Sequence, residues 1–476
     1  MVPMDIDVEN RRFAVVGLGL SGAAVCRFLL RRNARVFATD LSMDPAVKKT
    51  AEELRGLGAD VLLGHHSDEV FRSADAIVIS PGVPHTLGPF EEARRRGVPV
   101  LGEIELAARF VSRPILAITG TNGKTTVTTL IGDILRRSGQ RVFVGGNIGN
   151  PLIEWVDRNE PVDWIVLEVS SFQLDTSETF RPDIGVLLNI TEDHLDRYAS
   201  MEAYAASKFR LFRRQRAEDW AVLNAGDAFV RQFADTVGSR RLWYNVSQAE
   251  AEEGARVTDS GILWRIPDEM LEAVEKRSGF RLRDPIDPWF RVDRKDIGLP
   301  GRHNVENVAA SILACMAAGA SEEAVRDAIR TFTGLSHRMT QVDVIDGVTF
   351  VDDSKATNVD AVVRALEGYD RNVVILLGGR DKMSPFERLR DAVSEHVRHA
   401  VVIGEAAGAI EEAIRDLVPV HRASSMEEAV TIGFRLARPG DVVLLSPACA
   451  SFDMFTSYAH RGQVFCEAVR RLGHDR

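Results

Sequence analysis

The sequence contains few cysteines and no cysteine motif. Its four cysteines, Cys26, Cys315, Cys449 and Cys466, are scattered over 476 residues, and no two have CxxC spacing. This distribution argues against a structural zinc site and against a disulfide framework. Long apolar runs are also missing, because stretches such as "VVILL" are far too short to span a bilayer. We therefore expect a protein of the reducing cytoplasm without a membrane partner.

Long basic runs are absent as well, and the formal net charge is −10. A nucleic-acid partner is therefore disfavoured, and so is an anionic membrane surface, although a local site can still bind phosphate. The first residues, MVPMDIDVENRRF, lack the basic segment and apolar segment of a secretory signal. This agrees with the expected cytoplasmic location.

What the sequence does contain is ordinary for a globular protein, with 45% hydrophobic and 27% charged residues. A chain of 476 residues is too long for one hydrophobic core, and a typical domain size of about 150 residues suggests about three domains. We place them at residues 1–110, 111–335 and 336–476. Residues 246–297 are charged and contain three prolines, so we interpret this stretch as an insertion or an elaborated connection.

Short runs rich in Val, Ile and Leu alternate with amphipathic segments almost throughout the chain. This alternation predicts repeated β-α units around parallel sheets, an α/β fold. Helices are expected from Ser21 onward and over 103–110, 127–139, 203–212 and 304–319. The clearest expected strands cover 12–19, 34–40, 76–82, 114–120, 141–146, 163–169, 183–190, 348–354, 373–379, 399–404 and 442–448.

The first glycine loop, "GLGLSG" at Gly17–Gly22, follows an expected strand and opens an expected helix. Asp40 stands at the end of the next strand, about 20 residues on, as in dinucleotide sites. Taken alone, the pattern favours NAD. The free N–H groups of a helix N-terminus bind any phosphate, however, so other nucleotides remain open. The plainer alternative is a tight turn that needs glycine and binds nothing.

The second loop, "GTNGKTT" at residues 120–126, also joins a strand to a helix. The standard P-loop pattern requires a glycine where this chain has Ile118. The parts of a phosphate cradle are nevertheless present, because Lys124 supplies a positive charge and Thr125 a hydroxyl for Mg²⁺. The alternative is an incidental glycine turn. Two nucleotide-type loops in one chain favour a ligase or a kinase over a dehydrogenase.

Two further residues follow expected strands of the same region. Glu168 ends the strand in "DWIVLEV", and His194 comes shortly after "DIGVLLNI". Open α/β sheets bind ligands at these strand ends, so Glu168 and His194 can share one metal with nucleotide oxygens. Lys208 lies on an expected helix between small and aromatic residues. A solvated lysine is the plain alternative there, whereas a buried one would be reactive.

The motifs "GTNGKTT" and "EDHLDRY" together resemble the Mur ligases of bacterial cell-wall synthesis, which are similar to folylpolyglutamate synthase. "SSFQLD", "GRHNVENVAA", "DDSKATN" and "LSPACASFDMF" narrow the resemblance to the members that add D-glutamate. It covers nearly the whole chain except 246–297. It implies a Rossmann-like N-terminal domain, a central P-loop ATPase-type α/β domain and a Rossmann-like C-terminal domain.

The resemblance also implies an activity. ATP would phosphorylate the carboxylate of UDP-N-acetylmuramoyl-L-alanine, and D-glutamate would attack the acyl phosphate to give an amide, ADP and phosphate. The implied cofactors are ATP and Mg²⁺, with Mn²⁺ as an alternative, and a carbamate formed on Lys208 from CO₂. The expected partners are these substrates alone, and we expect a monomer. Lys124, His194 and Lys208 would be catalytic.

The same resemblance assigns binding residues to this chain. The metal would be held by Thr125, Glu168, His194 and Lys208. The UDP-sugar would contact Gly17, Leu18, Gly19, Leu20, Ser21, Asp40, Leu41, Ser80, Pro81, Gly82 and Asn147. ATP would contact Gly120, Thr121, Asn122, Gly123, Lys124, Thr125, Thr126, Asn304, Asn307, Arg338 and Asp353. D-Glutamate would contact Lys355, Thr357, Lys382, Ser451, Phe452 and Tyr458.

Three competing interpretations make different predictions. An NAD-dependent oxidoreductase would explain "GLGLSG" and Asp40 but leave the second loop unexplained. A P-loop switch would hydrolyse ATP without any dependence on an amino acid. A sister Mur ligase or a folylpolyglutamate-type ligase would use another amino acid or acceptor.

Overall fold

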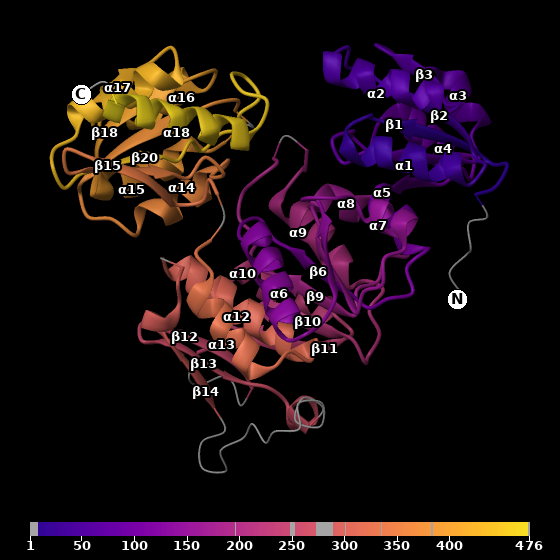
Figure 1. Cartoon of the computed structure of the whole chain (residues 1–476), viewed down its shortest axis with the longest axis horizontal. Helices are drawn as coiled ribbons and strands as arrows, with labels where there is room; N and C mark the ends of the chain where they lie inside the picture. Colours follow the sequence, from indigo (N-terminus) through magenta and orange to yellow (C-terminus); the bar gives the residue numbers. More distant parts are fainter. Residues whose placement is uncertain are drawn as a thin grey trace. The chain divides into compact units, whose positions relative to one another are not determined.

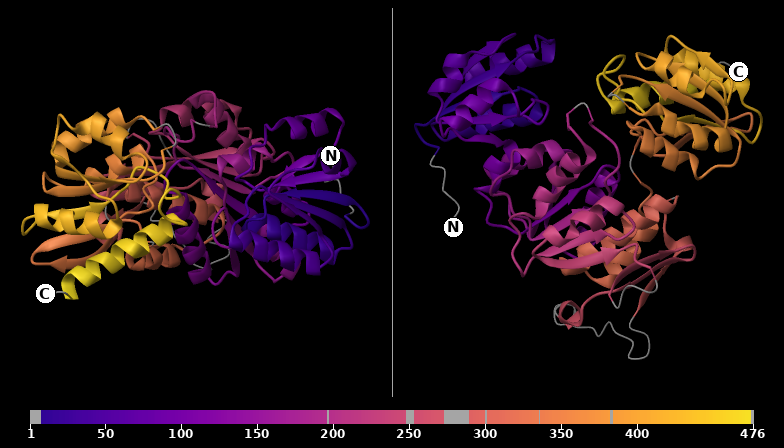
Figure 2. Two further views of the ribbon diagram at one scale, coloured as in Figure 1. Left: turned by 90° about the horizontal axis from the view of Figure 1, so that it is seen from above. Right: turned by 180° about the vertical axis from the view of Figure 1, so that it is seen from behind.

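The computed structural model describes residues 8–195, 197–247, 253–272, 289–299, 301–334, 336–381 and 384–474. Contacts within the chain divide it into two compact units. The first comprises Met1–Ile190, Glu202–Asp296 and Glu306–Arg330, and the second comprises Thr191–Met201, Ile297–Val305 and Thr331–Arg476. The described residues form three sheets, each accompanied by helices (Figures 1 and 2).

The N-terminal sheet of the first unit is parallel, with strand order β3-β2-β1-β4-β5. The strand order reverses between β1 and β4, and open α/β sheets bind ligands beside such a switch point. The strands are β1 Arg12–Val16, β2 Arg35–Asp40, β3 Asp60–Leu63, β4 Ala76–Ile79 and β5 Val100–Gly102. The helices are α1 Leu20–Arg31, α2 Pro45–Gly56, α3 Asp68–Ser73, α4 Gly88–Arg95 and α5 Glu103–Ala108.

The central sheet of the first unit has nine strands in the order β14-β13-β12-β11-β10-β9-β6-β8-β7. The strands are β6 Ile115–Thr119, β7 Val142–Gly146, β8 Trp164–Glu168, β9 Ile184–Leu187, β10 Trp220–Asn224, β11 Arg240–Tyr244, β12 Gly254–Thr258, β13 Gly261–Arg265 and β14 Phe290–Asp293. The accompanying helices are α6 Lys124–Arg137, α7 Leu152–Arg158, α8 Ser171–Asp175, α9 Met201–Phe209, α10 Ala228–Phe233, α12 Arg302–Ala317 and α13 Glu322–Thr331, with short 3-10 turns at Arg210–Phe212, Ala234–Thr236 and Arg294–Asp296.

The sheet of the second unit has the order β15-β16-β20-β17-β18-β19. Its strands are β15 Thr340–Ile345, β16 Val348–Asp352, β17 Val373–Gly378, β18 Val397–Ile403, β19 Val420–Arg422 and β20 Val442–Leu445. Two separate apolar cores cover its faces. One contains residues of α14 Val359–Leu366, α15 Arg390–His396 and α16 Ala407–Ile414, and the other contains residues of α17 Met426–Leu436 and α18 Tyr458–His474. A 3-10 turn at Phe386–Leu389 precedes α15.

The expected α/β class and the expected strands and helices are confirmed, with ends that differ by a few residues. The sheets are mainly parallel, as predicted, but strands pair antiparallel at two edges. β12, β13 and β14 pair antiparallel, so part of the 246–297 stretch extends the central sheet. β15 also pairs antiparallel with β16, because an Asp346-Gly347 turn folds the two strands into a hairpin.

The three domain boundaries stay a prediction, although each sheet lies within one predicted domain. Over the described part of the chain, no helix combines the length and the apolar character needed to cross a bilayer.

Candidate functional site

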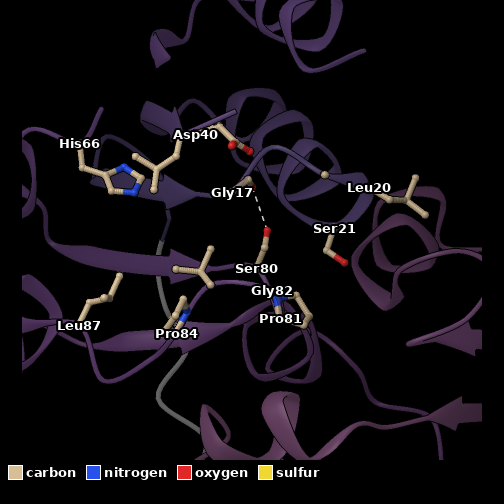
Figure 3. A pocket seen from close by; sticks show the side chains of 13 residues that line it. Gly17, Leu20, Ser21, Asp40, His66, Ser80, Pro81, Gly82, Pro84 and Leu87 are labelled. Atoms are coloured by element: carbon tan, nitrogen blue, oxygen red, sulfur yellow. Dashed lines mark hydrogen bonds between the residues drawn. The ribbon is translucent and has the colours of Figure 1, made fainter. Parts of the chain in front are cut away.

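A pocket of about 460 Å³ opens at the carboxyl edge of the N-terminal sheet. Figure 3 shows Leu20 and Ser21 on one side of it and His66 and Leu87 on the other. The pocket gathers most of the residues assigned to a UDP-sugar, since its lining includes Gly17, Gly19, Leu20, Ser21, Asp40, Leu41, Ser80, Pro81 and Gly82. It is also lined by His66, Val83, Pro84 and Leu87.

The glycine loop beside this pocket is held by close backbone contacts. Ser80 Oγ donates to the Gly17 carbonyl oxygen over 2.9 Å (Figure 3). A Cβ atom at Gly22 would lie 1.8 Å from that same carbonyl oxygen, so only glycine fits at this position. The close approach brings the start of α1 next to β4 and leaves its first N–H groups near the pocket.

Asp40 has a structural part in the pocket wall. Its Oδ2 accepts from the Leu18 N–H over 2.6 Å, and its Oδ1 accepts from the Ser42 N–H over 2.8 Å. The carboxylate thus fixes the glycine loop to the end of β2. Leu18 is buried and contributes through this backbone contact rather than as a lining side chain.

The second loop, between β6 and α6, is anchored to the end of β9 by an asparagine. Asn189 Oδ1 accepts from the Asn122 N–H over 2.8 Å, and Asn189 Nδ2 donates to the Asn122 carbonyl oxygen over 3.1 Å. Gly123 has φ +85°, and a Cβ atom there would lie 2.4 Å from Asn307 Oδ1. The loop is therefore anchored by Asn189 and depends on glycine at position 123, and its use as a phosphate cradle stays a prediction.

Two lysines converge on this cradle. Lys124 Nζ donates to the carbonyl oxygens of Gly120 and Thr121 over 2.8 and 2.7 Å. Lys208 Nζ donates to the same Gly120 oxygen over 2.9 Å and lies 4.4 Å from the centroid of the Tyr204 ring. The Tyr204 hydroxyl in turn contacts Thr121 Oγ1 at 3.3 Å. Lys208 is only 1% exposed, which contradicts the interpretation of a solvated lysine.

Glu168 ends β8 and is 2% exposed. Its Oε1 accepts from Asn147 Nδ2 over 2.9 Å, whereas its buried Oε2 has no hydrogen-bond partner among the described residues. A buried carboxylate oxygen without a donor is suited to a cation. Asn147 therefore contacts the candidate metal residue, and it does not line the pocket at Gly17.

In the second unit, loops after β16 and β20 carry the candidate amino-acid residues. These parallel strands are neighbours, so their carboxyl ends meet at one edge. Lys355 Nζ donates to the Tyr458 hydroxyl over 3.3 Å, and Ser354 Oγ donates to the Tyr458 carbonyl oxygen over 2.8 Å. Ser451 is buried and Phe452 is 63% exposed.

Asp353 lies at the same edge. Burial raises the pKa of Asp353 to about 7, and the charge of Arg338 acts in the opposite direction. Its Oδ2 accepts from Ser446 Oγ over 3.0 Å, and its Oδ1 accepts from the Met339 N–H over 3.4 Å. The structure therefore brings two of the residues assigned to ATP, Asp353 and Arg338, near each other.

The remaining assigned residues fall in different parts of the chain. Gly120 to Thr126 and Asn307 belong to the first unit, and His194, Asn304 and Thr357 belong to the second. Lys382 lies outside the described residues. Among the described residues, no three His, Cys, Asp or Glu side chains gather into a metal site. The expected metal site depends on Lys208 and on nucleotide oxygens, so its composition stays a prediction.

Three residues were missed in the sequence. His66 follows β3 at the same sheet edge as Asp40, and the rule that strand ends bind ligands could have indicated it. Asn189 follows β9 in the same way. Tyr204 precedes Lys208 by one helical turn, but its contact with Thr121 crosses 83 residues of sequence and left no local signal.

Family models match along the chain in the order of its three sheets. The Mur ligase MurD-like N-terminal domain matches residues 11–102, the Mur ligase middle domain residues 118–315, and the Mur ligase glutamate ligase domain residues 337–449. A curated relative from Desulfosudis oleivorans, named UDP-N-acetylmuramoylalanine–D-glutamate ligase, is 49% identical over 98% of both chains. The chain belongs to the Mur ligase family. It therefore belongs to a family of ATP-dependent ligases that use Mg²⁺.

Other relatives carry the same name. One from Desulfatibacillum aliphaticivorans is 44% identical over 98% of this chain and 100% of the relative. One from Koribacter versatilis is 44% identical over 98% of this chain and 99% of the relative. Solved structures are more distant and bear on the fold. A pseudomurein peptide ligase type C from Methanothermus fervidus has a TM-score of 0.60 at 18% identity over 97% and 100% of the two chains. A MurF ligase from Thermotoga maritima has a TM-score of 0.59 at 15% identity, over 99% of this chain and 100% of the solved chain.

Proposed function

We propose that the chain is an ATP-dependent ligase that adds D-glutamate to UDP-N-acetylmuramoyl-L-alanine during peptidoglycan precursor synthesis. The observation that carries this proposal is the similarity, over 98% of this chain, to relatives named for that reaction. The separate nucleotide-sized pocket and lysine-rich cradle support it, because the reaction needs a nucleotide sugar and ATP together. An enzyme using these two substrates would act in the cytoplasm, where ATP is made.

The chemistry explains why two substrates must meet near a cation. A carboxylate is a poor electrophile, so transfer of the ATP γ-phosphate to its oxygen supplies a leaving group. The D-glutamate amine then attacks the acyl carbon, and the tetrahedral intermediate releases phosphate. Lys124 is suited to the first step, because its ammonium can exchange two loop carbonyls for phosphate oxygens and offset the charge of two anions.

The metal fits residues of this chain. Within the first unit, Thr125 offers a hydroxyl and Glu168 offers its buried Oε2. The bound Mg²⁺ would neutralise negative charge on the transferred phosphate. Lys208 is the proposed carbamate site. Reaction of its neutral amine with CO₂ leaves one N–H, so the hydrogen bond to Gly120 can survive the modification.

The D-glutamate end is proposed at the loops of the second unit. Lys355 offers an ammonium beside Tyr458, and Thr357 and Ser451 offer hydroxyl donors to the two carboxylates of the amino acid. Lys382 and Phe452 complete the proposed set by sequence resemblance. We also infer that the enzyme is a monomer, which light scattering would test.

Phosphate release tests the proposed function directly. The full chain is assayed with ATP, Mg²⁺ and UDP-N-acetylmuramoyl-L-alanine, together with each of a panel of amino acids. D-Glutamate should stimulate release strongly, and other amino acids should not. Equal stimulation by L-lysine or by L-glutamate would instead favour a sister ligase, and phosphate release without any amino acid would favour a switch. NADH binding measured by fluorescence would favour the oxidoreductase.

A variant isolates the role of the cradle. Lys124→Ala should abolish ADP formation and leave UDP affinity near the wild-type value, because the pocket at Gly17 contains no residue of the cradle. ADP formation at the normal rate would contradict the assignment of this loop to ATP.

A further inference from the structure

His66 is the one titratable side chain besides Asp40 in the described lining of the Gly17 pocket. It follows β3, which pairs in parallel with β2, so it stands at the same sheet edge as Asp40. Figure 3 shows its imidazole ring at the side of the pocket opposite Leu20 and Ser21. The glycine loop thus occupies one side of the pocket and an imidazole the other.

The two sides suit different parts of a nucleotide. None of the described lining residues is Lys or Arg, so the phosphates depend on the N–H groups at the start of α1. The opposite side combines His66 with the apolar side chains of Pro84 and Leu87 (Figure 3). A flat base fits this apolar side better than a phosphate, because burying a charge there would have no cation to offset it.

The hydrogen bonds of His66 determine which ring nitrogen carries the proton. Thr39 Oγ1 donates to the His65 carbonyl oxygen over 3.1 Å and lies 3.0 Å from His66 Nδ1. A hydroxyl has one proton and a carbonyl oxygen can only accept, so both contacts are satisfied only when Nδ1–H donates to Thr39. Nε2 of the neutral ring is then a hydrogen-bond acceptor.

The ring is neutral near pH 7. Burial lowers the pKa of His66 from its usual value near 6.5, and the charge of Asp40 only partly opposes that effect. A neutral His66 Nε2 at the apolar side of the pocket can accept a hydrogen bond, so it favours a base that presents an N–H donor to it. Uracil has an N–H at ring position 3, whereas cytosine has an unprotonated nitrogen there.

We propose that His66 is a specificity residue that accepts the N3–H of uracil through Nε2. This inference rests on the proposed use of a UDP-sugar, and it adds the means by which the enzyme distinguishes uracil from cytosine nucleotides. Thr39 acts as the positioning residue, since it fixes the ring and its protonated nitrogen.

The test compares UDP and CDP binding to the full chain by titration calorimetry. His66→Asn is the central variant, because an asparagine amide can still donate to Thr39 but has no acceptor at the Nε2 position. His65→Asn is the matched control, since His65 is an exposed histidine that does not line the pocket. Thermal unfolding of all three proteins verifies that they are folded.

Wild-type protein and His65→Asn should bind UDP more tightly than CDP. His66→Asn should lose about tenfold in UDP affinity, the value of one hydrogen bond, with little change for CDP. An equal loss for both nucleotides, or no loss, would overturn the role of His66 and leave the proposed function intact. A wild-type protein that binds neither nucleotide would overturn the proposed UDP site, and the role of His66 with it.

Discussion

At the scale of single residues, the Gly120 carbonyl oxygen is the point where the two proposed catalytic lysines meet. Lys124 and Lys208 both donate to it, although 88 residues of sequence separate Lys208 from Gly120. Lys208 is almost fully buried, and its ammonium contacts the Gly120 carbonyl oxygen and the Tyr204 ring. Carbamate formation there requires the neutral amine, because only an unprotonated nitrogen attacks CO₂.

We expect Lys208→Ala to reduce ligase activity by roughly two orders of magnitude or more, in the range that electrostatic groups supply to catalysis. Added formate should restore part of the activity, because a small carboxylate can replace the negative charge of a carbamate. Lys208→Arg keeps the positive charge and the donor but cannot carry the carbamate, so it should remain inactive. Normal activity in either variant would rule out an essential carbamate.

Glu103 gives a prediction about pH. Burial raises its pKa to about 7, and its Oε1 accepts from the Ile153 N–H over 2.7 Å while Oε2 has no partner among the described residues. The folded protein therefore holds a proton that the unfolded chain releases above about pH 4.5. The stability from this protonated group is fully present below that pH and is lost as pH rises through about 7.

Replacing the Glu103 carboxyl should remove its contribution to the pH dependence of stability. Glu103→Gln should flatten the fall in the free energy of unfolding between pH 5 and 8, which amounts to at most about 3 kcal/mol in the wild type. Urea unfolding at the two pH values measures the difference. A variant that loses stability with pH as steeply as the wild type would show that Glu103 ionises normally.

At the scale of secondary-structure elements, α5 joins the N-terminal sheet to the central part of the first unit. Besides Glu103, it presents Glu105, which is fully buried. Glu105 Oε2 accepts from the N–H groups of Glu178, Thr179 and Phe180, each over 3.0 Å. Its Oε1 accepts from Arg109 over 3.0 Å. One short helix therefore satisfies the backbone donors of a segment more than 70 residues away.

We expect Glu105→Ala to lower the free energy of unfolding by roughly 3 kcal/mol, because it leaves the buried Phe180 N–H, two partly buried N–H groups and Arg109 without their acceptor. Glu92→Ala is the control, since Glu92 pairs with Arg95 on the surface and its loss should cost less than about 0.5 kcal/mol. Urea titration of both variants measures the contrast. If both variants lost similar free energies of unfolding, the hydrogen bonds of Glu105 on α5 would not be important for stability.

The elements also show what sequence could and could not predict. The strands, the two glycine loops and the strand-end residues Asp40 and Glu168 have local patterns, so they were predictable. Glu105 looks like an ordinary helix residue in the sequence. The backbone N–H groups that donate to its carboxylate come from a distant segment, so only the fold identifies them. The antiparallel strands β12 to β14 lie in a charged stretch whose pattern resembles an insertion, and their pairing depends on the edge strand β11.

At the scale of the whole molecule, the chain consists of two compact units whose candidate sites use different residues. Every lining residue of the Gly17 pocket lies between residues 17 and 87, within the first unit. The apolar core that contains Phe465 belongs to the second unit. A ligand of the pocket should therefore stabilise the first unit, because it binds the folded form of that unit alone.

Calorimetry of the full chain can test whether a pocket ligand stabilises the first unit alone. If the units unfold separately, UDP at 100 times its Kd should stabilise one transition by about 2.7 kcal/mol and leave the other in place. Phe465→Ala identifies the second transition, because emptying a buried aromatic site costs about 3–5 kcal/mol and should lower that transition only. A UDP shift in the transition that Phe465→Ala lowers would mean that the two units unfold in one cooperative transition, and it would contradict separate stabilisation of the first unit.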